Sequence, residues 1–593
     1  MKKVIMSGNE AIARGAYEAG CAVAAAYPGT PSTEILESMS GYKEDVFCHW
    51  ACNEKVATEI ALGASIGGAR ALCAMKHVGV NVAADPLFTM GYAGVNGGLV
   101  VVTADDPGCH SSQNEQDNRL YAPHMKIGMM EPSDSEECRV FTAAAFELSE
   151  RFDVPMLIRV TTRTCHSQSL VTIEDRSDTP VKKYVRDPAK YAMVPANARG
   201  RHIVREKLIS EMEDYANDCP FNRVEMGTNH KIGIITSGIS YQYAREAFGD
   251  SASYLKLGLT FPYPRKLIQE FAEQFETIYV IEENEPYLEN VVKSLGIDCI
   301  GKDRLPICGE LNAQIIRSRL IGVTETDTYS TDVEIPTRPP VLCAGCPHRG
   351  FFHGVNRNLK RIVPVGDIGC YSLGVSSPLD GLDYLICMGA GLSSTIGLSK
   401  ALELQGDTRK VLGMLGDSTF YHSGITSLID IVVTNANVIA CILDNSITAM
   451  TGHQDNPGTG RSVMGDVTPV IDIETVVRSL GLGDDRIRVI DPLDRDAVMD
   501  ALESGINTKG PFVIITKSPC ALLREVVRRN AGRHCVVDED KCRGCRQCMK
   551  ISCPAIAFEN KKAKIRVSAG CNGCGLCMQI CPIGAVSRVE VRA

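Results

Sequence analysis

No apolar run in the 593 residues reaches the roughly 18–20 residues that a transmembrane helix needs. The chain starts MKKVIMSGNEAIARG, where Gly8 and Glu10 stand in place of the apolar segment of a signal peptide. Hydrophobic residues make up 44% of the chain and charged residues 22%, which is typical of a soluble globular protein. We therefore expect a cytoplasmic protein without a membrane segment and without a nucleic-acid partner.

Cysteine, in contrast, is abundant, with 25 residues. In a secreted chain this number would indicate disulfides, but in a long cytosolic chain it favours metal or redox chemistry. Eight cysteines fall in two runs near the end, CRGCRQCMKISCP at 542–554 and CNGCGLCMQICP at 571–582. The other 17 are scattered, and most are expected to be small buried side chains.

The charge of the chain is uneven. The formal net charge is −9, yet residues 521–593 hold 14 Lys and Arg against 6 Asp and Glu. One interpretation is a solubilising surface that offsets the negative charge of bound clusters. The other is a docking face that attracts an acidic redox partner.

Short apolar runs alternate with Ala- and Gly-rich helical segments over most of the chain. CAVAAAYPGTP, for example, is followed by NEKVATEIALGASIGGARALCAM and then by GGLVVVTADD. This alternation predicts an α/β protein of doubly wound parallel sheets covered by helices. The composition shifts predict domains at 1–190, 229–322 and 323–525, a linker with a helix at 191–228, and a small α+β domain at 526–593.

The two cysteine runs predict iron–sulfur clusters. The second run has the bacterial ferredoxin spacing, in which the fourth cysteine of each run ligates the other cluster. Zinc or unliganded cysteines are the alternatives, but zinc sites usually pair two CxxC units over a longer gap. The first run departs from the pattern by one extra residue before its last cysteine. The predicted ligands of one [4Fe-4S] cluster are Cys542, Cys545, Cys548 and Cys581, and those of the other are Cys571, Cys574, Cys577 and Cys553.

The segment 416–447 resembles the thiamine diphosphate motif, which reads GDG, about 25 residues, then NN. Here Gly416-Asp417-Ser418 is followed after 25 residues by Asp444-Asn445, so Ser418 replaces the third glycine. Asp417 and Asn445 supply the oxygen ligands that Mg²⁺ prefers, and the resemblance adds the backbone carbonyl of Ile447. Such residues follow adjacent strands, where open α/β sheets bind ligands. The alternative is a pair of turn residues that cap strands.

Two Gly-rich strand ends precede this motif. They are Gly366-Asp367 in GDIGC and Met388-Gly389 in CMGAG. Together with Gly416 they are predicted to line the cofactor. Met388 lies 29 residues before Asp417, close to the spacing of a bulky residue that props the bent cofactor in thiamine enzymes. A plain core methionine is the alternative.

Thiamine enzymes also need a glutamate from a separate domain, which hydrogen-bonds the aminopyrimidine ring. Glu54 in NEKVATEIALGAS is our candidate because it begins a predicted helix. Glu59 on the same segment competes with it. A glutamate on a helix surface is the alternative interpretation.

Several segments together carry a wider resemblance. They are YPGTPSTE, MKHVGVNVAADP, SSQNEQDNR, CAGCPHRG, GDIGCYSLG, LDNSITAMTGHQ and the double ferredoxin run. The chain resembles, over essentially its whole length, the alpha subunits of indolepyruvate ferredoxin oxidoreductases, within the 2-oxoacid:ferredoxin oxidoreductase superfamily. The resemblance implies a pyrimidine-binding domain, a transketolase C-terminal-like domain, a diphosphate-binding domain and a ferredoxin domain, in that order. It also implies a separate, smaller beta subunit.

The resemblance implies further site residues. Thr30 of the YPGTPS segment would contact the carboxylate of the substrate, and Arg119 would join it as a bidentate partner. Lys76 and His77 would lie near the cofactor, with an ordinary surface loop as the alternative. Relatives also bind a cluster near the cofactor through a CxxC and two distant cysteines. The matching residues here are Cys343, Cys346, Cys370 and Cys520, and the alternative is buried cysteines, with His348 contacting the diphosphate.

The function implied is oxidative decarboxylation of aryl 2-oxoacids, above all indole-3-pyruvate, with coenzyme A as acyl acceptor and ferredoxin as electron acceptor. Branched-chain 2-oxoacids or pyruvate are alternative substrates. A non-oxidative thiamine decarboxylase is a rival reading, but it needs no electron path and leaves the eight tail cysteines without a role. An electron-transfer subunit is another, but it would lack Glu54 and the pair Asp417 and Asn445.

Overall fold

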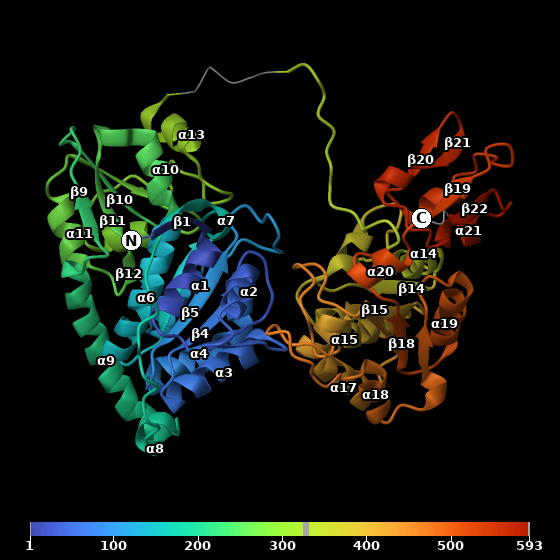
Figure 1. Cartoon of the computed structure of the whole chain (residues 1–593), viewed down its shortest axis with the longest axis horizontal. Helices are drawn as coiled ribbons and strands as arrows, with labels where there is room; N and C mark the ends of the chain where they lie inside the picture. Colours follow the sequence, from blue (N-terminus) through green and yellow to red (C-terminus); the bar gives the residue numbers. More distant parts are fainter. Residues whose placement is uncertain (1, 324–330, 591–593) are drawn as a thin grey trace. The chain divides into compact units, whose positions relative to one another are not determined.

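The computed structural model describes residues 2–323 and 331–590, which fall into two units. Unit 1 comprises the chain up to Asp332 together with Ser462–Asp466. Unit 2 comprises Val333–Arg461 and the chain from Val467 onward. Figure 1 follows the chain through both by colour.

A seven-stranded sheet forms the centre of unit 1, in the order β12-β6-β7-β5-β4-β2-β3. All neighbouring pairs are parallel except β12 with β6. Every residue of β4 and β5 is buried, as expected when helices cover both faces of a parallel sheet. The strands are β2 (Val23–Ala26), β3 (Phe47–Trp50), β4 (Ala71–Lys76), β5 (Leu99–Asp105), β6 (Gly128–Met130), β7 (Met156–Thr161) and β12 (Leu259–Phe261).

Helices connect these strands, and local sequence signals set their ends. The side chain of Asn53 caps helix α3 by accepting a hydrogen bond from the backbone N–H of Val56 at 2.9 Å. Gly68 ends the same helix with φ +104°, a conformation that favours glycine. The helices of this part are α1 (Gly8–Glu18), α2 (Thr33–Ser40), α3 (Glu54–Gly67), α4 (His77–Ala93), α5 (Tyr121–Met125), α6 (Ser135–Arg151) and α7 (Thr162–His166). Strands β1 (Lys2–Ser7) and β8 (Gln168–Ile173) pair with each other as an antiparallel ribbon.

A second sheet of unit 1 has the order β13-β10-β11-β9, in which only β9 is antiparallel to its neighbour. The predicted linker contains the long helix α9 (Pro195–Asp218), which Figure 1 shows along the side of the unit. The remaining elements are α8 (Pro188–Tyr191), β9 (Arg223–Glu225), β10 (Ile232–Ser237), α10 (Gly238–Phe248), β11 (Ser253–Leu257), α11 (Arg265–Ala272), β13 (Thr277–Ile281), α12 (Tyr287–Ser294) and α13 (Ala313–Ile316).

A five-stranded, fully parallel sheet forms the main part of unit 2, which we call the sheet domain. Its order is β14-β15-β16-β18-β17. The strands are β14 (Ile362–Val365), β15 (Lys410–Gly416), β16 (Val438–Asp444), β17 (Ile487–Ile490) and β18 (Phe512–Lys517). The helices are α14 (His348–Arg357), α15 (Ala390–Gln405), α16 (Asp417–Thr419), α17 (Ile425–Val433), α18 (Ile473–Ser479), α19 (Arg495–Asn507) and α20 (Arg524–Arg529).

The last part of unit 2, which we call the tail, consists of two antiparallel ribbons and short helical turns. Its small core contains Cys535, Ile551, Ile556, Leu576 and Ile580. Such a core is too small to dominate the stability of a domain, and bound metal commonly supplements it. The elements are β19 (Arg533–Val537), the 3-10 helix η7 (Gln547–Ile551), β20 (Ile556–Glu559), β21 (Lys562–Ile565), α21 (Leu576–Ile580) and β22 (Val586–Glu590).

The predicted α/β class is confirmed, with parallel sheets and a small cysteine-rich tail. The domain boundaries stay a prediction. Strand β12 lies in the predicted second domain yet pairs with β6 of the first, so the two share a sheet. In the part of the chain that the structure describes, no helix combines the length and the apolar character that a membrane crossing requires.

Candidate functional site

The first group of predicted residues gathers at the carboxyl edge of the seven-stranded sheet. Strands β2 and β4 are parallel neighbours, so the loops that follow them emerge side by side. The half-buried Thr30 follows β2 and Lys76 ends β4. A Cβ atom at Gly29 would lie 3.1 Å from the Cβ of Lys76, which shows how closely the two loops approach.

Glu54 lies in the same region and is 6% exposed. Its carboxyl group packs over Gly79 of α4, where an added Cβ would lie 2.7 Å from the Glu54 Oε1 atom. Glu59, the competing candidate, is exposed and forms an ion pair with Lys55. The structure thus favours Glu54, which has a defined position, over Glu59, which faces solvent.

Lys76 and His77 are both buried, so they do not belong to an ordinary surface loop. The Lys76 ammonium donates to the carbonyl of Ser111 at 2.7 Å, and burial lowers its pKa to about 8. Burial also lowers the pKa of His77. Its Nε2 lies 3.3 Å from Asn114 Oδ1, and its Nδ1 has no hydrogen-bond partner among the described residues. His77 is therefore a neutral imidazole with one nitrogen unsatisfied.

Arg119 does not fit its predicted role as a substrate ligand. It is 1% exposed and its guanidinium donates to the carboxylates of Asp117 and Glu282 at 2.6 and 2.7 Å. It also donates to the carbonyl of Glu283 at 2.7 Å and stacks over the ring of Tyr287. These internal partners give Arg119 a structural role, because a ligand carboxylate would have to replace buried ion pairs.

The second group lies at the carboxyl edge of the sheet domain. Asp417 directly follows β15 and is 4% exposed, and Asn445 directly follows the parallel neighbour β16. Asn445 Oδ1 accepts from the backbone N–H of Ile447 at 3.3 Å, and the same N–H lies against Asp417. The three residues predicted around Mg²⁺ thus share one neighbourhood.

The chemistry of this neighbourhood fits a divalent cation. Burial, together with the nearby carboxylate of Asp444, raises the pKa of Asp417 to about 7. A bound cation would restore the ionised form that burial disfavours. Asn456 donates to Asp417 Oδ2 at 3.1 Å, a contact that the sequence motif does not indicate because Asn456 lies 39 residues away.

The Gly-rich strand ends line the same edge but mainly position the backbone. Asp367 is fully buried and its Oδ2 accepts from the N–H of Gly391 at 2.8 Å, at the start of α15. Gly389 has φ +92°, and an added Cβ would lie 2.4 Å from Ser423 Oγ. The half-buried Met388 accepts from that hydroxyl through its carbonyl at 3.1 Å. Gly366 packs against Leu382 and Gly416 against Tyr371 in the same close manner.

His348 is a buried residue of the sheet domain whose ring could hydrogen-bond a cofactor. It is 2% exposed, and neither ring nitrogen has a hydrogen-bond partner among the described residues. Burial lowers its pKa to about 4, so the ring is neutral at neutral pH. Its ring meets that of Tyr371 edge-on at 6.0 Å. Buried polar atoms are normally satisfied, so this histidine fits a hydrogen bond to a bound group such as the predicted diphosphate.

The four cysteines of the possible third cluster, which we call the sheet-domain set, come together in the structure. Cys346 and Cys370 each lie near Cys343, and Cys520 and Asp417 both act on the ionisation of Cys370. The backbone N–H of Cys520 donates to the carbonyl of Asn445 at 2.9 Å. This set therefore adjoins the residues of the thiamine motif.

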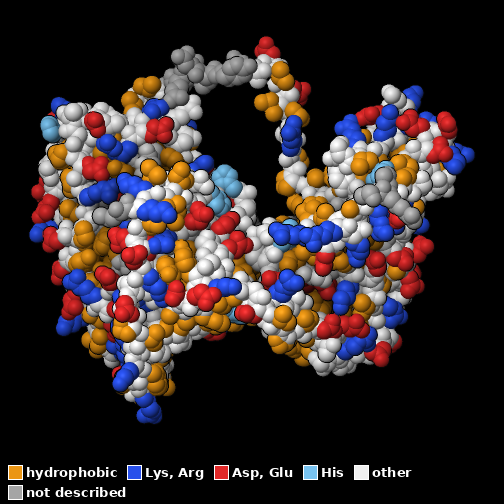
Figure 2. Space-filling model, viewed as in Figure 1, with side chains coloured by type: hydrophobic (Ala, Val, Ile, Leu, Met, Phe, Trp, Pro, Cys, Tyr) orange, Lys and Arg blue, Asp and Glu red, His pale blue; other side chains and the backbone are white. Residues whose placement is uncertain are grey.

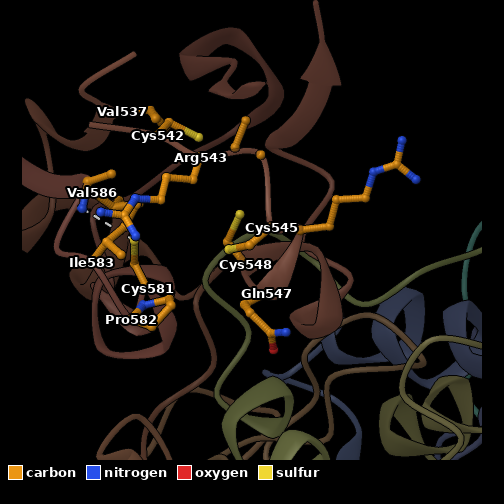
Figure 3. A pocket seen from close by; sticks show the side chains of 14 residues that line it. Val537, Cys542, Arg543, Cys545, Gln547, Cys548, Cys581, Pro582, Ile583 and Val586 are labelled. Carbon is orange, nitrogen blue, oxygen red and sulfur yellow. Dashed lines mark hydrogen bonds between the residues drawn. The ribbon is translucent and has the colours of Figure 1, made fainter. Parts of the chain in front are cut away.

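The first tail set surrounds one pocket. Cys542, Cys545, Cys548 and Cys581 all line it, as Figure 3 shows. The Sγ of Cys581 accepts from the N–H of Ala585 at 3.3 Å, the kind of hydrogen bond that cluster ligands receive.

Three cysteines of the second tail set lie near one another, and their role as ligands stays a prediction. Cys571 and Cys553 both act on the ionisation of Cys574. The N–H of the buried Cys535 donates to Cys571 Sγ at 3.3 Å, a neighbour that the spacing pattern does not indicate. Among the described residues, no group of three or more His, Cys, Asp or Glu converges closely enough to hold a single metal ion. Ligands of a four-iron cluster surround a hollow instead, which is how the first tail set is arranged.

Three family models match successive parts of the chain. A pyruvate flavodoxin/ferredoxin oxidoreductase thiamine diphosphate-binding domain matches residues 14–218. The C-terminal binding domain of thiamine pyrophosphate enzymes matches 367–516, and a 4Fe-4S dicluster domain matches 534–582. These matches contain Glu54, the pair Asp417 and Asn445, and both tail runs.

Curated relatives match the chain over nearly its whole length. The indolepyruvate oxidoreductase subunit IorA of Archaeoglobus fulgidus is 40% identical, covering 99% of this chain and 97% of the relative. The chain belongs to the IorA family. Members from Pyrococcus horikoshii and Methanothermobacter thermautotrophicus are each 38% identical, with 97% of each relative covered. Membership in the IorA family confirms the predicted family, the enzyme class, and thiamine diphosphate and [4Fe-4S] clusters as cofactors. The individual site residues stay predictions.

Gly79→Ala tests the position of Glu54. The new Cβ would lie 2.7 Å from the carboxyl oxygen, so Glu54 must move, and misplacing a catalytic group by about 1 Å costs about 100-fold in rate. We expect turnover with 2-oxoacid to fall by roughly that factor, measured by reduction of a viologen dye. Gly63→Ala on α3 is the control, because nothing lies within 4 Å of its added Cβ. Full turnover of Gly79→Ala would show that Glu54 does not need this position.

The raised pKa of Asp417 predicts a pH dependence for cofactor binding. Below about pH 7 the carboxyl group is protonated, so a cation must displace a proton. The affinity for Mg²⁺ and thiamine diphosphate should therefore fall about tenfold per pH unit below that value and level off above it. Calorimetric titration at several pH values measures this. An affinity that is flat from pH 5.5 to 8, or an Asp417→Asn variant that binds as well as the unaltered chain, would refute the assignment.

Proposed function

We propose that this chain is the catalytic subunit of an enzyme that oxidatively decarboxylates aryl 2-oxoacids, with indole-3-pyruvate as the main substrate. Coenzyme A accepts the acyl group and ferredoxin accepts the electrons. The observation that carries the proposal is the position of the sheet-domain set. Cys520 is hydrogen-bonded to Asn445, so a one-electron carrier held there would adjoin the cofactor that holds the substrate.

The electron count requires such an arrangement. One 2-oxoacid anion and one coenzyme A thiol give carbon dioxide, an acyl thioester, one proton and two electrons, and each ferredoxin cluster accepts one electron. Thiamine diphosphate supplies the electron sink for decarboxylation when bound. The protein must therefore bind the cofactor, orient the substrate and lead two electrons away singly.

The residues of unit 1 act on the organic groups in this proposal. The carboxyl group of Glu54 hydrogen-bonds the aminopyrimidine ring and holds its tautomer. The hydroxyl group of Thr30 donates to the substrate carboxylate. The Lys76 ammonium, with a pKa of about 8, is still largely protonated at neutral pH and supplies the positive charge nearby.

The residues of the sheet domain hold the diphosphate. Asp417, Asn445 and the carbonyl of Ile447 ligate Mg²⁺, which neutralises the phosphates. The neutral ring of His348 donates a hydrogen bond to a phosphate oxygen through one of its unpartnered nitrogens. Met388, just before α15, would support the cofactor from one side. The sheet-domain set and the two tail sets then bind three [4Fe-4S] clusters.

The relatives are subunits of an oxidoreductase, and we propose that this chain likewise pairs with a smaller beta subunit. Its electrons leave by the first tail set. Cys545 is exposed, and the tail residues Arg546, Lys550 and Lys561 are exposed as well. Figure 2 shows several Lys and Arg side chains on the visible face of the tail, with Asp and Glu side chains among them. None of the three forms an ion pair with a described residue, so their charge is available to an acidic carrier.

An anaerobic assay of the chain with its beta subunit tests the function. We expect ferredoxin reduction that requires a 2-oxoacid, thiamine diphosphate and coenzyme A together. Across indole-3-pyruvate, phenylpyruvate, 4-hydroxyphenylpyruvate, a branched 2-oxoacid and pyruvate, kcat/KM should be highest for the aryl acids. Carbon dioxide release without an electron acceptor would instead indicate a non-oxidative decarboxylase. Ferredoxin reduction without a 2-oxoacid would indicate an electron-transfer subunit.

Charge reversal tests the docking face. Lys550→Glu with Lys561→Glu should raise the KM for an acidic ferredoxin about tenfold at low salt and remove most of the salt dependence, because it removes attraction at the rim. Turnover with a zwitterionic sulfonatopropyl viologen, which has no net charge, should not change. Arg199→Glu with Lys207→Glu on α9 is the matched control, since both side chains are exposed and lie in unit 1. An equal effect of the two double variants would refute the docking face.

A further inference from the structure

Arg349, the second residue of α14, is a buried cation without a carboxylate partner. Its side chain is among the largest fully enclosed ones, at 2% exposed. Its hydrogen bonds all go to backbone carbonyls, and no acidic side chain of the described residues forms an ion pair with it. Burying a charge without an ionic partner is costly, so negative charge in the surroundings would stabilise this guanidinium.

The carbonyls come from two segments that are far apart in sequence. Arg349 Nε donates to Cys343 at 2.9 Å, and another guanidinium nitrogen donates to Leu342. The remaining nitrogen donates to Ile551 at 2.9 Å and to Ser552. One segment belongs to the CxxC of the sheet-domain set and the other leads into Cys553 of the second tail set. Arg349 therefore ties the two cysteine sets together.

A turn before Cys553 lets the tail offer two carbonyls to Arg349 at once. Ser552 has φ +54°, a left-handed conformation that is uncommon for a residue with a side chain. Its N–H donates to the carbonyl of Met549 within η7, so the chain turns there before Cys553. This turn presents the carbonyls of Ile551 and Ser552 to the same nitrogen of Arg349.

The negative groups nearest to Arg349 are cysteines of both sets. Cys553, Cys346, Cys343 and Cys574 are the groups whose ionisation acts on it most strongly. Once these cysteines ligate iron as thiolates, each cluster carries negative charge. The negative charge of these clusters would then offset the cost of burying the guanidinium.

Other contacts between the tail and the sheet domain are made by the second cysteine run, 571–582. A Cβ at Gly345 would lie 2.2 Å from the side-chain amide of Asn572, next to Cys571. Gln579 donates to the carbonyl of Leu493 at 2.8 Å and accepts from the N–H of Arg495 at 2.9 Å. The second tail set is therefore the one fixed against the sheet domain, and Arg349 lies within that contact.

We propose that Arg349 is the positioning residue of the electron step between the sheet-domain set and the second tail set. It holds the Cys343–Cys346 loop against the loop before Cys553, and its positive charge raises the reduction potentials of both clusters. In that step one electron leaves the cluster of the sheet domain and reduces the cluster of the tail, with no bond made or broken. The inference rests on the proposed function, because it requires a cluster on the sheet-domain set.

Two substitutions separate the charge of Arg349 from its geometry. Arg349→Gln removes the positive charge, so both cluster potentials should fall, and with them the magnetic coupling between the reduced clusters. Arg349→Lys keeps the charge but cannot reach four carbonyls. It should retain the potentials while the coupling weakens and hydrogen exchange at 549–553 accelerates. Redox titration with dithionite, followed by electron paramagnetic resonance, measures the first two quantities in the complete enzyme.

Arg357→Gln is the control, because Arg357 is exposed at the other end of the same helix. It should leave potentials, coupling and exchange unchanged. The inference is overturned if Arg349→Gln keeps the potentials of the unaltered enzyme. If Arg349→Gln does not assemble its clusters, Arg349→Lys is the deciding variant. Unaltered magnetic coupling and hydrogen exchange in Arg349→Lys would overturn the inference. Weaker coupling and faster exchange with retained potentials would support it.

These measurements distinguish a failure of the inference about Arg349 from a failure of the proposed function. The titrations use dithionite and no substrate, so they report on Arg349 even if the enzyme prefers another 2-oxoacid. An unaltered enzyme without a cluster on the sheet-domain set would show no coupling signal for that pair, which refutes the proposed electron path before any variant is compared. An unaltered enzyme with the signal, and variants identical to it, would refute the role of Arg349 alone.

Discussion

The carboxyl edge of the five-stranded parallel sheet is the constraint on which the site in unit 2 depends. Asp367, Asp417 and Asn445 follow three neighbouring strands, β14, β15 and β16, so the fold delivers them to one edge. Cys520 follows β18 and is hydrogen-bonded to Asn445 at that edge. Because all these strands are parallel, polar groups that are far apart in sequence meet without any special loop. Burying these polar groups costs free energy of desolvation, and a bound cation and phosphate group would lower that cost.

The tail extends this arrangement outward. Its second cysteine set is fixed to the sheet domain through Arg349 and through Gln579. Its first set lies around a separate pocket with Cys545 exposed (Figure 3). The order of the three sets along the molecule thus agrees with an electron path from a buried organic cofactor to a protein carrier. The small core of the tail depends on these metal sites as much as the path does.

Local sequence patterns predicted the fold class and indicated most residues of the candidate site, whose roles stay predictions. Cysteine spacing is informative because ligands within one run are fixed by a few backbone torsions, and the GD and DN pairs mark strand ends. Two cysteines were assigned to partners far away in the sequence. Cys553 was assigned to the second run because the fourth cysteine of a ferredoxin run ligates the other cluster, and Cys520 was assigned to the CxxC by resemblance.

What the sequence could not provide are contacts between distant segments. Arg119 looked like a ligand for a carboxylate, but Glu282, some 160 residues away, already pairs with it. Gly79, which makes room for Glu54, and Asn456, which donates to Asp417, carry no signal in their own neighbourhood. The predicted domain boundary after residue 228 assigns β12 to the second domain, although β12 pairs with β6 in the first sheet. In each case tertiary packing decides which partner a side chain finds, and composition or periodicity does not record it.

The most direct test of the account is the iron content of the anaerobically purified enzyme, counted by cluster. Mössbauer spectra of protein grown on ⁵⁷Fe should show three [4Fe-4S] clusters, or about twelve irons per chain. Cys520→Ala should lose about four of them while it retains both tail clusters and binds thiamine diphosphate. About eight irons in the unaltered chain, with no change in Cys520→Ala, would contradict the claim that the cofactor site opens directly onto a metal cluster.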